Sequence, residues 1–389
     1  MKHRFISKRY WNDISTPMGE SAGLLSKYDD IINFSLGDPD FTTHDLIIDK
    51  SMEDAKAGHT HYTDFFGDPE LRDEICNYYR EDFAMDVKRE EVMIATSGCH
   101  AMWLALEAIL DDGDEVIIHD PFFTPYPQQI ELCRGKVVYL PTFEEELFEI
   151  NVDRLEQLIT NRTKALVVNT PNNPTGTCFR KSTLEQIAQV ALKHDLIVIA
   201  DDVYTAFSFD EPFIPIASLE GMKERTIILG TFSKNYAMTG WRIGYIIAPD
   251  FLIKTIKDIN ENNVFTAPSV SQRAAIYALR ERKNVVPPIV QEVKSRLDYA
   301  YKRICSIPKM SCIPPRGSMY MFVNIKETGL SSTEVCDILL REAHIVALPG
   351  IAFGNAGEGY IRLALTIDIP HLEEAFDRIE RLSIFSEKD

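Results

Sequence analysis

The sequence predicts a two-domain α/β protein, in which the larger domain is built on a mostly parallel, seven-stranded sheet flanked by helices. Three observations predict this fold. Seven short apolar runs rich in Val and Ile recur between residues 92 and 248, which is typical of strands buried on both faces. Helix-like segments alternate with these runs, as in parallel sheets covered by helices. The 389 residues are more than one small core accommodates, so a second domain is expected.

The expected elements follow the chain in order. The strands are Val92–Thr96, Glu115–His119, Lys136–Leu140, Ala165–Asn169, Leu196–Ala200, Thr226–Gly230 and Arg242–Ala248, and the helices include Ala101–Leu110, Ser182–Lys193 and Phe251–Asn260. A long helical pattern follows Pro287-Pro288 and extends to Cys305, after which Met319–Asn324 and Tyr360–Thr366 are expected to be strands. We therefore expect a large domain at 48–285 and a smaller α+β domain formed by the two chain ends, 1–47 and 286–389.

Composition and charge narrow the function classes. The chain has 59 acidic and 41 basic residues and a net charge of −18, which argues against binding to nucleic acid or to an anionic membrane. The seven cysteines form no CxxC pair, so a zinc site or disulfide framework is not expected and a reducing compartment is. The basic start precedes no apolar run, and nothing approaches the ~20 apolar residues of a membrane span, so we expect a cytoplasmic protein. We also expect no metal site.

Lys234 is the first candidate for chemistry. It lies in Thr231-Phe232-Ser233-Lys234, a polar loop between two expected strands, and Arg242 follows eight residues later in Gly240-Trp241-Arg242-Ile243-Gly244. Most lysines are simply solvated at the surface. A lysine that condenses with an aldehyde needs a desolvated, electropositive site, and a nearby arginine can supply that field and bind a phosphate.

Asp201 is the second candidate, because it follows the expected strand Leu196–Ala200 directly. The carboxyl ends of parallel strands border the crevice in which α/β proteins bind ligands. Asp201 is either a turn residue or the ion-pair partner of a pyridinium nitrogen, which would keep a cofactor ring electron-withdrawing. Tyr204, three residues later, could donate a hydrogen bond to the ring's phenolic oxygen.

Two further polar segments also follow expected strands. Asn169–Gly176 has the composition of an ordinary Pro/Asn/Gly turn, but a rigid turn could also aim an Asn amide at a cofactor and a substrate carboxylate. Thr96–His100 leads into an apolar helix. Ser97 could be a plain N-cap there, or the free N–H groups beside Gly98 could form an anion site.

Together and in this order, these elements resemble the fold-type I pyridoxal-phosphate (PLP) enzymes, and among them the class I/II aminotransferases. The likeness extends over nearly the whole chain. It is carried by Gly37-Asp38-Pro39-Asp40-Phe41, Tyr62-Thr63 with Gly67, Leu71-Arg72, Ser97-Gly98, Pro121-Phe122-Phe123 with Tyr126, Asn172-Asn173-Pro174-Thr175-Gly176, Asp201-Asp202-Val203-Tyr204, Ser233-Lys234, Gly240-Trp241-Arg242-Ile243-Gly244, Pro349-Gly350 with Phe353-Gly354, and Arg362. The resemblance implies the PLP-dependent transferase fold and transfer of an amino group from an L-amino acid to a 2-oxo acid.

The resemblance also implies a role for each matching residue. Lys234 holds pyridoxal 5'-phosphate as a Schiff base and then transfers the proton, Asp201 binds the pyridine nitrogen, and Tyr204 and Asn173 bind the phenolic oxygen. Asp201 is preferred to Asp202 because the family pattern is Asp, two residues, then Tyr. The remaining cofactor contacts are expected from Phe123, which stacks on the ring, and from Gly98, Cys99, Thr231, Ser233 and Arg242 on the phosphate.

The family pattern further implies a homodimer with shared active sites, in which Tyr62 reaches the phosphate of the neighbouring subunit. Arg362 is expected to bind the substrate α-carboxylate as a bidentate pair, assisted by Asn173 and the Gly37 backbone. Each assignment has a plainer alternative: Phe123 and Tyr126 are core aromatics, Arg362 forms a structural ion pair, and Tyr62 is an ordinary loop residue.

One residue departs from the pattern. His100 stands where many of these enzymes carry a lysine, which some of them use on dicarboxylic substrates, so aspartate is less favoured as a substrate here. We expect His100 to lie in the first helical turn without a special role.

Two other functions remain open. A carbon–sulfur β-lyase of the cystathionine β-lyase kind would use the same Lys, Asp, Tyr and Arg on the same scaffold. A transcriptional regulator with an aminotransferase-like sensor is disfavoured, because fewer than 40 residues precede Gly37 and the charge is strongly negative.

Overall fold

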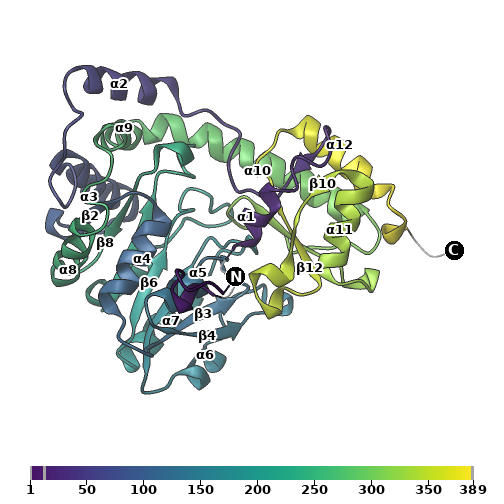
Figure 1. Ribbon diagram of the computed structural model, residues 1–389, viewed down its shortest axis with the longest axis horizontal. Coiled ribbons are helices and arrows are strands. Elements are labelled where there is room, and N and C mark those ends of the chain that lie inside the picture. Colours follow the sequence, from purple (N-terminus) through teal and green to yellow (C-terminus); the bar gives the residue numbers. More distant parts are fainter. Residues whose placement is uncertain (1, 12–14, 387–389) are drawn as a thin grey trace.

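The computed structural model describes residues 2–11 and 15–386, and its largest unit is a seven-stranded sheet (Figure 1). The spatial order is β2 (Val92–Ala95), β8 (Gly244–Ile247), β7 (Thr226–Thr231), β6 (Ile197–Asp201), β5 (Thr163–Asn169), β3 (Glu115–Asp120) and β4 (Lys136–Pro141). Among these strands only β8 runs antiparallel to its neighbours. The predicted mostly parallel sheet is confirmed. The last expected strand begins two residues late, because Arg242 takes a positive φ of 54° that ends the preceding turn.

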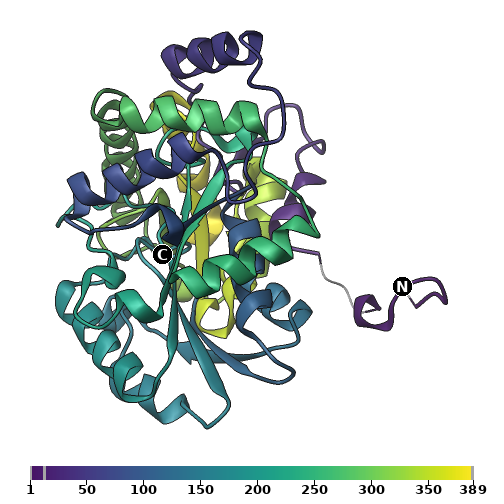
Figure 2. The ribbon, with the colours of Figure 1, turned by 90° about the vertical axis from the view of Figure 1, so that its left-hand side faces the viewer.

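Helices cover both faces of this sheet (Figures 1 and 2). Alternate side chains of β5 point into different cores, Ala165 and Val167 into one, Leu166 and Val168 into the other, as strand geometry requires. The first core also contains residues of α4 (Gly98–Ile109), α5 (Tyr126–Leu132) and α8 (Asp250–Glu261), and the second contains residues of α3 (Pro69–Phe83), α7 (Lys181–Lys193) and α9 (Ser269–Arg280). The carboxyl ends of the parallel strands are left uncovered by this arrangement.

A smaller sheet has its own core. The antiparallel strands β11 (Leu348–Pro349), β12 (Tyr360–Ala364) and β9 (Tyr320–Asn324) form it, and β1 (Ile32–Asn33) pairs in parallel with β10 (Ile345–Val346) beside it. Helices α11 (Ser332–Ala343) and α12 (Ile369–Glu380) pack against it. The two strands expected in this region are confirmed. Because β1 belongs to the same core, the N-terminal segment lies next to the C-terminal part of the chain.

Helix α10 (Arg282–Ser306) runs continuously from the large sheet to the small one (Figure 1). It starts before Pro287-Pro288, so the expectation that the helix begins after these prolines is wrong. Prolines inside a helix cost hydrogen bonds, but here the first turn is held by other contacts. Arg282 pairs with Asp82 at 2.9 Å, and Val285 packs into the core of the large sheet.

The remaining α-helices are α1 (Pro17–Ala22), α2 (Asp45–Lys56) and α6 (Val152–Leu158). Across the part of the chain that the structure describes, we find no helix with both the length and the apolar character needed to cross a bilayer.

Candidate active site

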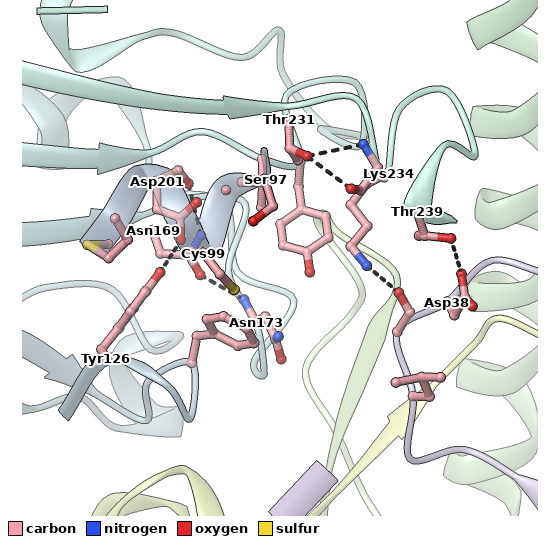
Figure 3. Close-up of a pocket in the computed structure, with 18 of the residues that line it drawn as sticks. Asp38, Ser97, Cys99, Tyr126, Asn169, Asn173, Asp201, Thr231, Lys234 and Thr239 are labelled. Atoms are coloured by element: carbon pink, nitrogen blue, oxygen red, sulfur yellow. Dashed lines mark hydrogen bonds between the residues drawn. The ribbon is translucent and has the colours of Figure 1, made fainter. Parts of the chain in front are cut away.

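A cavity of about 300 Å³ opens at the carboxyl ends of β5, β6 and β7, next to the first turn of α4. Of the predicted site residues, all except Arg362 and Tyr62 line it. Figure 3 shows how they are distributed: Asp201 and Tyr126 lie on one side, Lys234 and Asp38 on the other, with Thr231 between them. Side chains from distant parts of the sequence thus converge where the topology of a parallel sheet places a binding site.

One end of the cavity is rich in groups that bind anions. The hydroxyl of Thr231 donates to Ser233 Oγ at 3.0 Å and accepts from the Ser233 amide at 3.2 Å. Arg242 is exposed at the same end, where its Nη1 donates to the Thr239 carbonyl at 2.7 Å. Ser97 caps α4 by accepting from the His100 amide, which leaves the amides of Gly98 and Cys99 at the helix start. Hydroxyls, a guanidinium and helix N–H groups together suit a phosphate.

Asp201 is the buried carboxylate of the cavity. It ends β6, is 7% exposed, and accepts a hydrogen bond from the phenol of Tyr126. Burial raises the pKa of Asp201 to about 6, although the hydrogen bond from Tyr126 acts in the opposite direction. Asp202 does not line the cavity. Its carboxyl is buried, its Oδ2 has no hydrogen-bond partner within residues 2–11 and 15–386, and burial raises its pKa well above the ordinary value.

Lys234 reaches into the cavity from the loop after β7. Its Nζ donates a hydrogen bond to the carbonyl of Gly37, which the N-terminal segment brings to the mouth of the cavity (Figure 3). Gly37 is packed so closely that a Cβ at this position would lie 2.0 Å from the hydroxyl of Tyr320. Tyr320 in turn shares a hydrogen bond of 2.8 Å with Tyr204. Lys234 thus shares the cavity with both tyrosines and binds a backbone position at which a Cβ would clash.

Arg362 lies behind the cavity wall. It is fully buried, its Nη1 donates to Asn173 Oδ1 at 3.2 Å, and its Nη2 donates to the Ser35 carbonyl. Among the described residues its Nε finds no hydrogen-bond partner, and burial lowers the pKa of the guanidinium. The rings of Tyr320 and Phe353 have their centroids 4.7 Å and 5.0 Å from the guanidinium carbon, and of the two rings Tyr320 also lines the cavity. The plainer alternative for Arg362, a structural ion pair, is not seen among the described residues, where its guanidinium contacts Asn173, the Ser35 carbonyl and two aromatic rings.

Tyr62 lies away from the cavity of its own chain. It is 80% exposed, and its ring contacts Phe265 with 4.9 Å between the centroids. His100 lies in the first turn of α4 as expected. Its Nδ1 accepts from the Thr96 amide at 3.3 Å, its ring stacks on Trp103, and burial lowers its pKa. It does not line the cavity.

Three residues of the site were not assigned a role from the sequence. Tyr126 was noted only as a motif residue or core aromatic, yet its hydroxyl binds Asp201. Tyr320 lies in a strand whose apolar pattern gave no hint of a polar contact. Asn169 did carry a signal, since it is a buried amide at the end of a strand, and it lines the cavity. Within residues 2–11 and 15–386 no group of His, Cys, Asp or Glu side chains is arranged to hold a metal ion.

Comparison with known proteins places this site in a family context. The family model described as aminotransferase class I and II matches residues 29–379. An aspartate aminotransferase of Pyrococcus abyssi is 40% identical over 357 residues, which are 91% of this chain and 92% of that protein. Aromatic-amino-acid aminotransferase 2 of Thermococcus litoralis is 38% identical, over 90% of this chain and 91% of its own. The crystal structure of an aromatic aminotransferase from Pyrococcus horikoshii superposes with a TM-score of 0.89 and 37% identity, covering 93% and 98% of the two chains.

Proposed function

The chain belongs to the class I and II aminotransferase family, and from that premise we propose that Lys234, Asp201 and Tyr204 are its catalytic residues. It is a PLP-dependent transaminase that moves an amino group between an amino acid and a 2-oxo acid. Relatives named as aminotransferases over nine-tenths of the chain favour this activity over that of a carbon–sulfur β-lyase. The observation that carries the residue assignments is that Lys234, Asp201 and the anion-binding groups face one cavity.

The residues of the cavity fit PLP. When bound, PLP supplies an aldehyde and an electron-withdrawing pyridinium ring. A buried carboxylate with a raised pKa needs a cationic partner to remain ionised, and Asp201 would find one in the ring nitrogen. The anion-binding end offers Thr231, Ser233 and Arg242 to the phosphate, together with the amides of Gly98 and Cys99.

The other side chains of the cavity take complementary roles. Lys234 Nζ would bind the aldehyde carbon and, once released by substrate, hold and move the proton of the substrate Cα as a general base. Tyr204 and Asn173 would donate to the phenolic oxygen. Phe123, which lines the cavity in edge contact with Tyr126, would cover one face of the ring. The ring would then be held at its nitrogen, oxygen, face and phosphate, so that it cannot tilt.

The substrate carboxylate is assigned to Arg362, with Asn173 and the Gly37 backbone beside it. The unpartnered Nε and the bond to Asn173 Oδ1 mean that this guanidinium has a donor to offer to an incoming carboxylate. A fork of two parallel hydrogen bonds would orient the amino acid while Lys234 acts on its Cα. Access requires Tyr320 to give way, because its ring covers the guanidinium.

Three further assignments complete the proposal. The dimer is supported by Tyr62, which is 80% exposed on the surface and unused in its own cavity. The domain division at 48–285, with 1–47 and 286–389 as the small domain, is supported by the two separate cores: Val285 packs in one and Val293 in the other. A cytoplasmic location is supported by the seven cysteines, all of which are free thiols.

The proposal is tested by half-reactions. The PLP form is mixed with single amino acids without an oxo acid, and the absorption of the Lys234-bound cofactor is followed. A transaminase loses this absorption once and stops, whereas a β-lyase would keep releasing pyruvate and ammonia from cystathionine or cysteine. Lys234→Ala should bind PLP without a borohydride-reducible link and lose turnover. Full activity in Lys234→Ala would overturn the assignment.

A further inference from the structure

The side chain of Asn169 connects two of the residues that face the cofactor cavity. Its Nδ2 donates to the backbone carbonyl of Asp201 at 2.9 Å. Its Oδ1 accepts from the backbone amide of Asn173 at 3.1 Å and from Asn172 Nδ2 at 3.2 Å. Asn169 is 1% exposed, so water does not compete for these bonds. A single carboxamide thus joins the end of β6 to the Pro/Asn turn that follows β5.

The direction of this amide is fixed by its partners. The backbone N–H of Asn173 can only donate, and the backbone carbonyl of Asp201 can only accept. A flipped Asn169 side chain would therefore place donor against donor and acceptor against acceptor. A side chain at 169 must therefore carry one acceptor and one donor at this spacing. Aspartate has the right shape but no donor, and an apolar residue leaves both backbone groups buried and unpaired.

The backbone of Asn169 is itself fixed by His119. The backbone N–H of Asn169 donates to His119 Nε2 at 3.3 Å, so this ring nitrogen must be the unprotonated one. The other ring nitrogen, Nδ1, then donates to the Pro121 carbonyl at 3.2 Å. Burial lowers the pKa of His119 to about 4, so the imidazole stays neutral and keeps its acceptor near neutral pH.

We propose that Asn169 is a positioning residue that sets the spacing between Asp201 and Asn173, and thereby allows both to bind the same cofactor ring. The inference rests on the proposed function, in which Asp201 binds the ring nitrogen and Asn173 the phenolic oxygen. The ring is rigid, so its two polar atoms lie at a fixed separation. Two side chains from different strands can bind both atoms only if their backbones are held in register.

Partial loss is expected when this link is removed. Asp201 keeps the hydrogen bond that Tyr126 donates, and Asn173 Oδ1 keeps the one that Arg362 donates, so neither side chain becomes free. What is lost is their relative position. We therefore expect weaker and altered cofactor binding rather than an empty site.

The test uses the full-length holoenzyme and compares Asn169→Ala with Asn151→Ala as a matched control. Asn151 also uses both ends of its amide: Oδ1 accepts from the Arg154 amide at 3.1 Å and Nδ2 donates to Glu146 at 3.0 Å. It caps α6 and does not line the cavity. Both variants should lower the melting temperature, because Asn169→Ala loses three hydrogen bonds and Asn151→Ala loses two.

Of the two alanine variants, only Asn169→Ala should change how the enzyme binds its cofactor. We expect PLP affinity of the apoenzyme to fall by roughly 10-fold to 100-fold, the size seen when residues that orient a ligand set are removed. The pH titration of the absorption of bound PLP should also shift, since that titration reports the environment of the ring. Asn169→Asp should weaken PLP binding as well, because it keeps the acceptor for Asn173 but loses the donor to the Asp201 carbonyl.

Two outcomes would contradict the proposal. If Asn169→Ala lowers the melting temperature but matches Asn151→Ala in PLP affinity and in the absorption titration, Asn169 has only a structural role. If Asn169→Asp binds PLP as wild type, the bond to the Asp201 carbonyl does not set the register. Lys234→Ala is measured in parallel to separate the two proposals. If Lys234→Ala loses turnover while Asn169→Ala behaves as the control variant, the proposed function stands and only the role of Asn169 is rejected. If Lys234→Ala keeps its turnover, the proposed function itself is rejected.

Discussion

The phenol of Tyr126 donates a hydrogen bond to the buried carboxylate of Asp201. It is the hydrogen bond that favours the ionised form of Asp201, whereas burial opposes that form. Because the two residues come from α5 and β6, the bond also ties the wall of the cavity to its floor. The carboxylate of Asp201, which is itself buried, is therefore held in one orientation at the cavity.

Replacing Tyr126 by Phe removes this bond and keeps the ring. A hydrogen bond to a charged group is worth about 1.5–3 kcal/mol, so we expect PLP affinity to fall by roughly 10-fold to 100-fold. The pKa of Asp201 should rise further, so the loss should be largest at low pH. Titration of the apoenzyme with PLP at several pH values measures both effects. Tyr139→Phe, on the outer strand β4 and 44% exposed, is the control, and an equal loss there would contradict the assignment.

Asp201→Asn should stabilise the apoenzyme at neutral pH. The folded-state pKa of Asp201, about 6, exceeds its ordinary value of 3.8, so the folded state binds the extra proton. The contribution of the Asp201 carboxyl to the free energy of unfolding is fully present below pH 4 and is lost as pH rises through 6. The asparagine variant does not ionise, so above pH 7 its free energy of unfolding should exceed that of wild type by about 3 kcal/mol.

Thermal unfolding of the two apoenzymes between pH 4 and 8 measures this difference. The two curves should converge at low pH and separate as pH rises. Saturating PLP should reverse the order, because only wild type offers the anion. Asp111→Asn, in an exposed loop, should show neither change. A constant difference across this pH range would mean that Asp201 does not titrate there.

The sheet and most of the site could be predicted because their signals are local. The strands of the large sheet are continuous apolar runs, and residues at their carboxyl ends must meet at one edge. Asp201, Lys234 and Asn173 therefore converge without any knowledge of packing. Phe123 and Cys99 came from the resemblance to a family, whereas Gly98 was also indicated by its position at the start of a helix. The cavity contains all three.

The contacts made between distant segments could not be predicted. Tyr320 lies 283 residues after Gly37, as the difference of the two residue numbers shows. Their segments are brought together by the pairing of β1 with β10 and by hydrogen bonds between the N-terminal segment and residues 364–366. The start of α10 was misplaced because proline predicts a helix boundary from local sterics. The long-range pairing of Arg282 with Asp82 holds a turn that those sterics disfavour.

Gly37→Ala should damage the site through Tyr320. The added Cβ would lie 2.0 Å from the Tyr320 hydroxyl and about 3 Å from the ring carbons, so the hydroxyl is the main obstacle. We expect kcat/KM to fall by roughly 10-fold, in line with overpacking costs of 1–3 kcal/mol. The double variant Gly37→Ala with Tyr320→Phe removes the obstacle. Its kcat/KM should therefore fall by less than the product of the two single-variant effects. Additive losses would show that Gly37 acts independently of Tyr320.

Arg362→Lys should separate substrate binding from cofactor binding. Lysine keeps the charge but cannot form the bidentate pair. We expect kcat/KM for amino acids to fall by roughly 10-fold to 100-fold, the effect of losing one charged hydrogen bond of 1.5–3 kcal/mol, while PLP affinity stays close to wild type. Steady-state kinetics and PLP titration measure the two quantities. An equal fall in both would mean that Arg362 supports Asn173 rather than the substrate.

Tyr62, Phe65 and Phe265 form an exposed aromatic patch. Their exposed fractions are 80%, 36% and 38%, and both phenylalanine–phenylalanine and tyrosine–phenylalanine contacts are edge-to-face. Aromatic residues are enriched at protein–protein interfaces. If this patch is the contact between two copies, Tyr62 of each chain enters the site of the other, and Tyr62→Phe should weaken PLP binding by roughly 10-fold through loss of one phosphate hydrogen bond.

Hybrid dimers decide which chain uses Tyr62. Lys234→Ala and Tyr62→Phe chains carrying different affinity tags are co-expressed, and the mixed dimer is purified. The site built on the Tyr62→Phe chain keeps its own Lys234 and receives Tyr62 from the other chain, so it should bind PLP as wild type does. The other site lacks both groups. At limiting PLP the hybrid should therefore show about half the wild-type activity per dimer, since one of its two sites is intact. If Tyr62 served its own chain, the only site with a lysine would carry phenylalanine at position 62, and the hybrid would show the weakened affinity of the Tyr62→Phe homodimer.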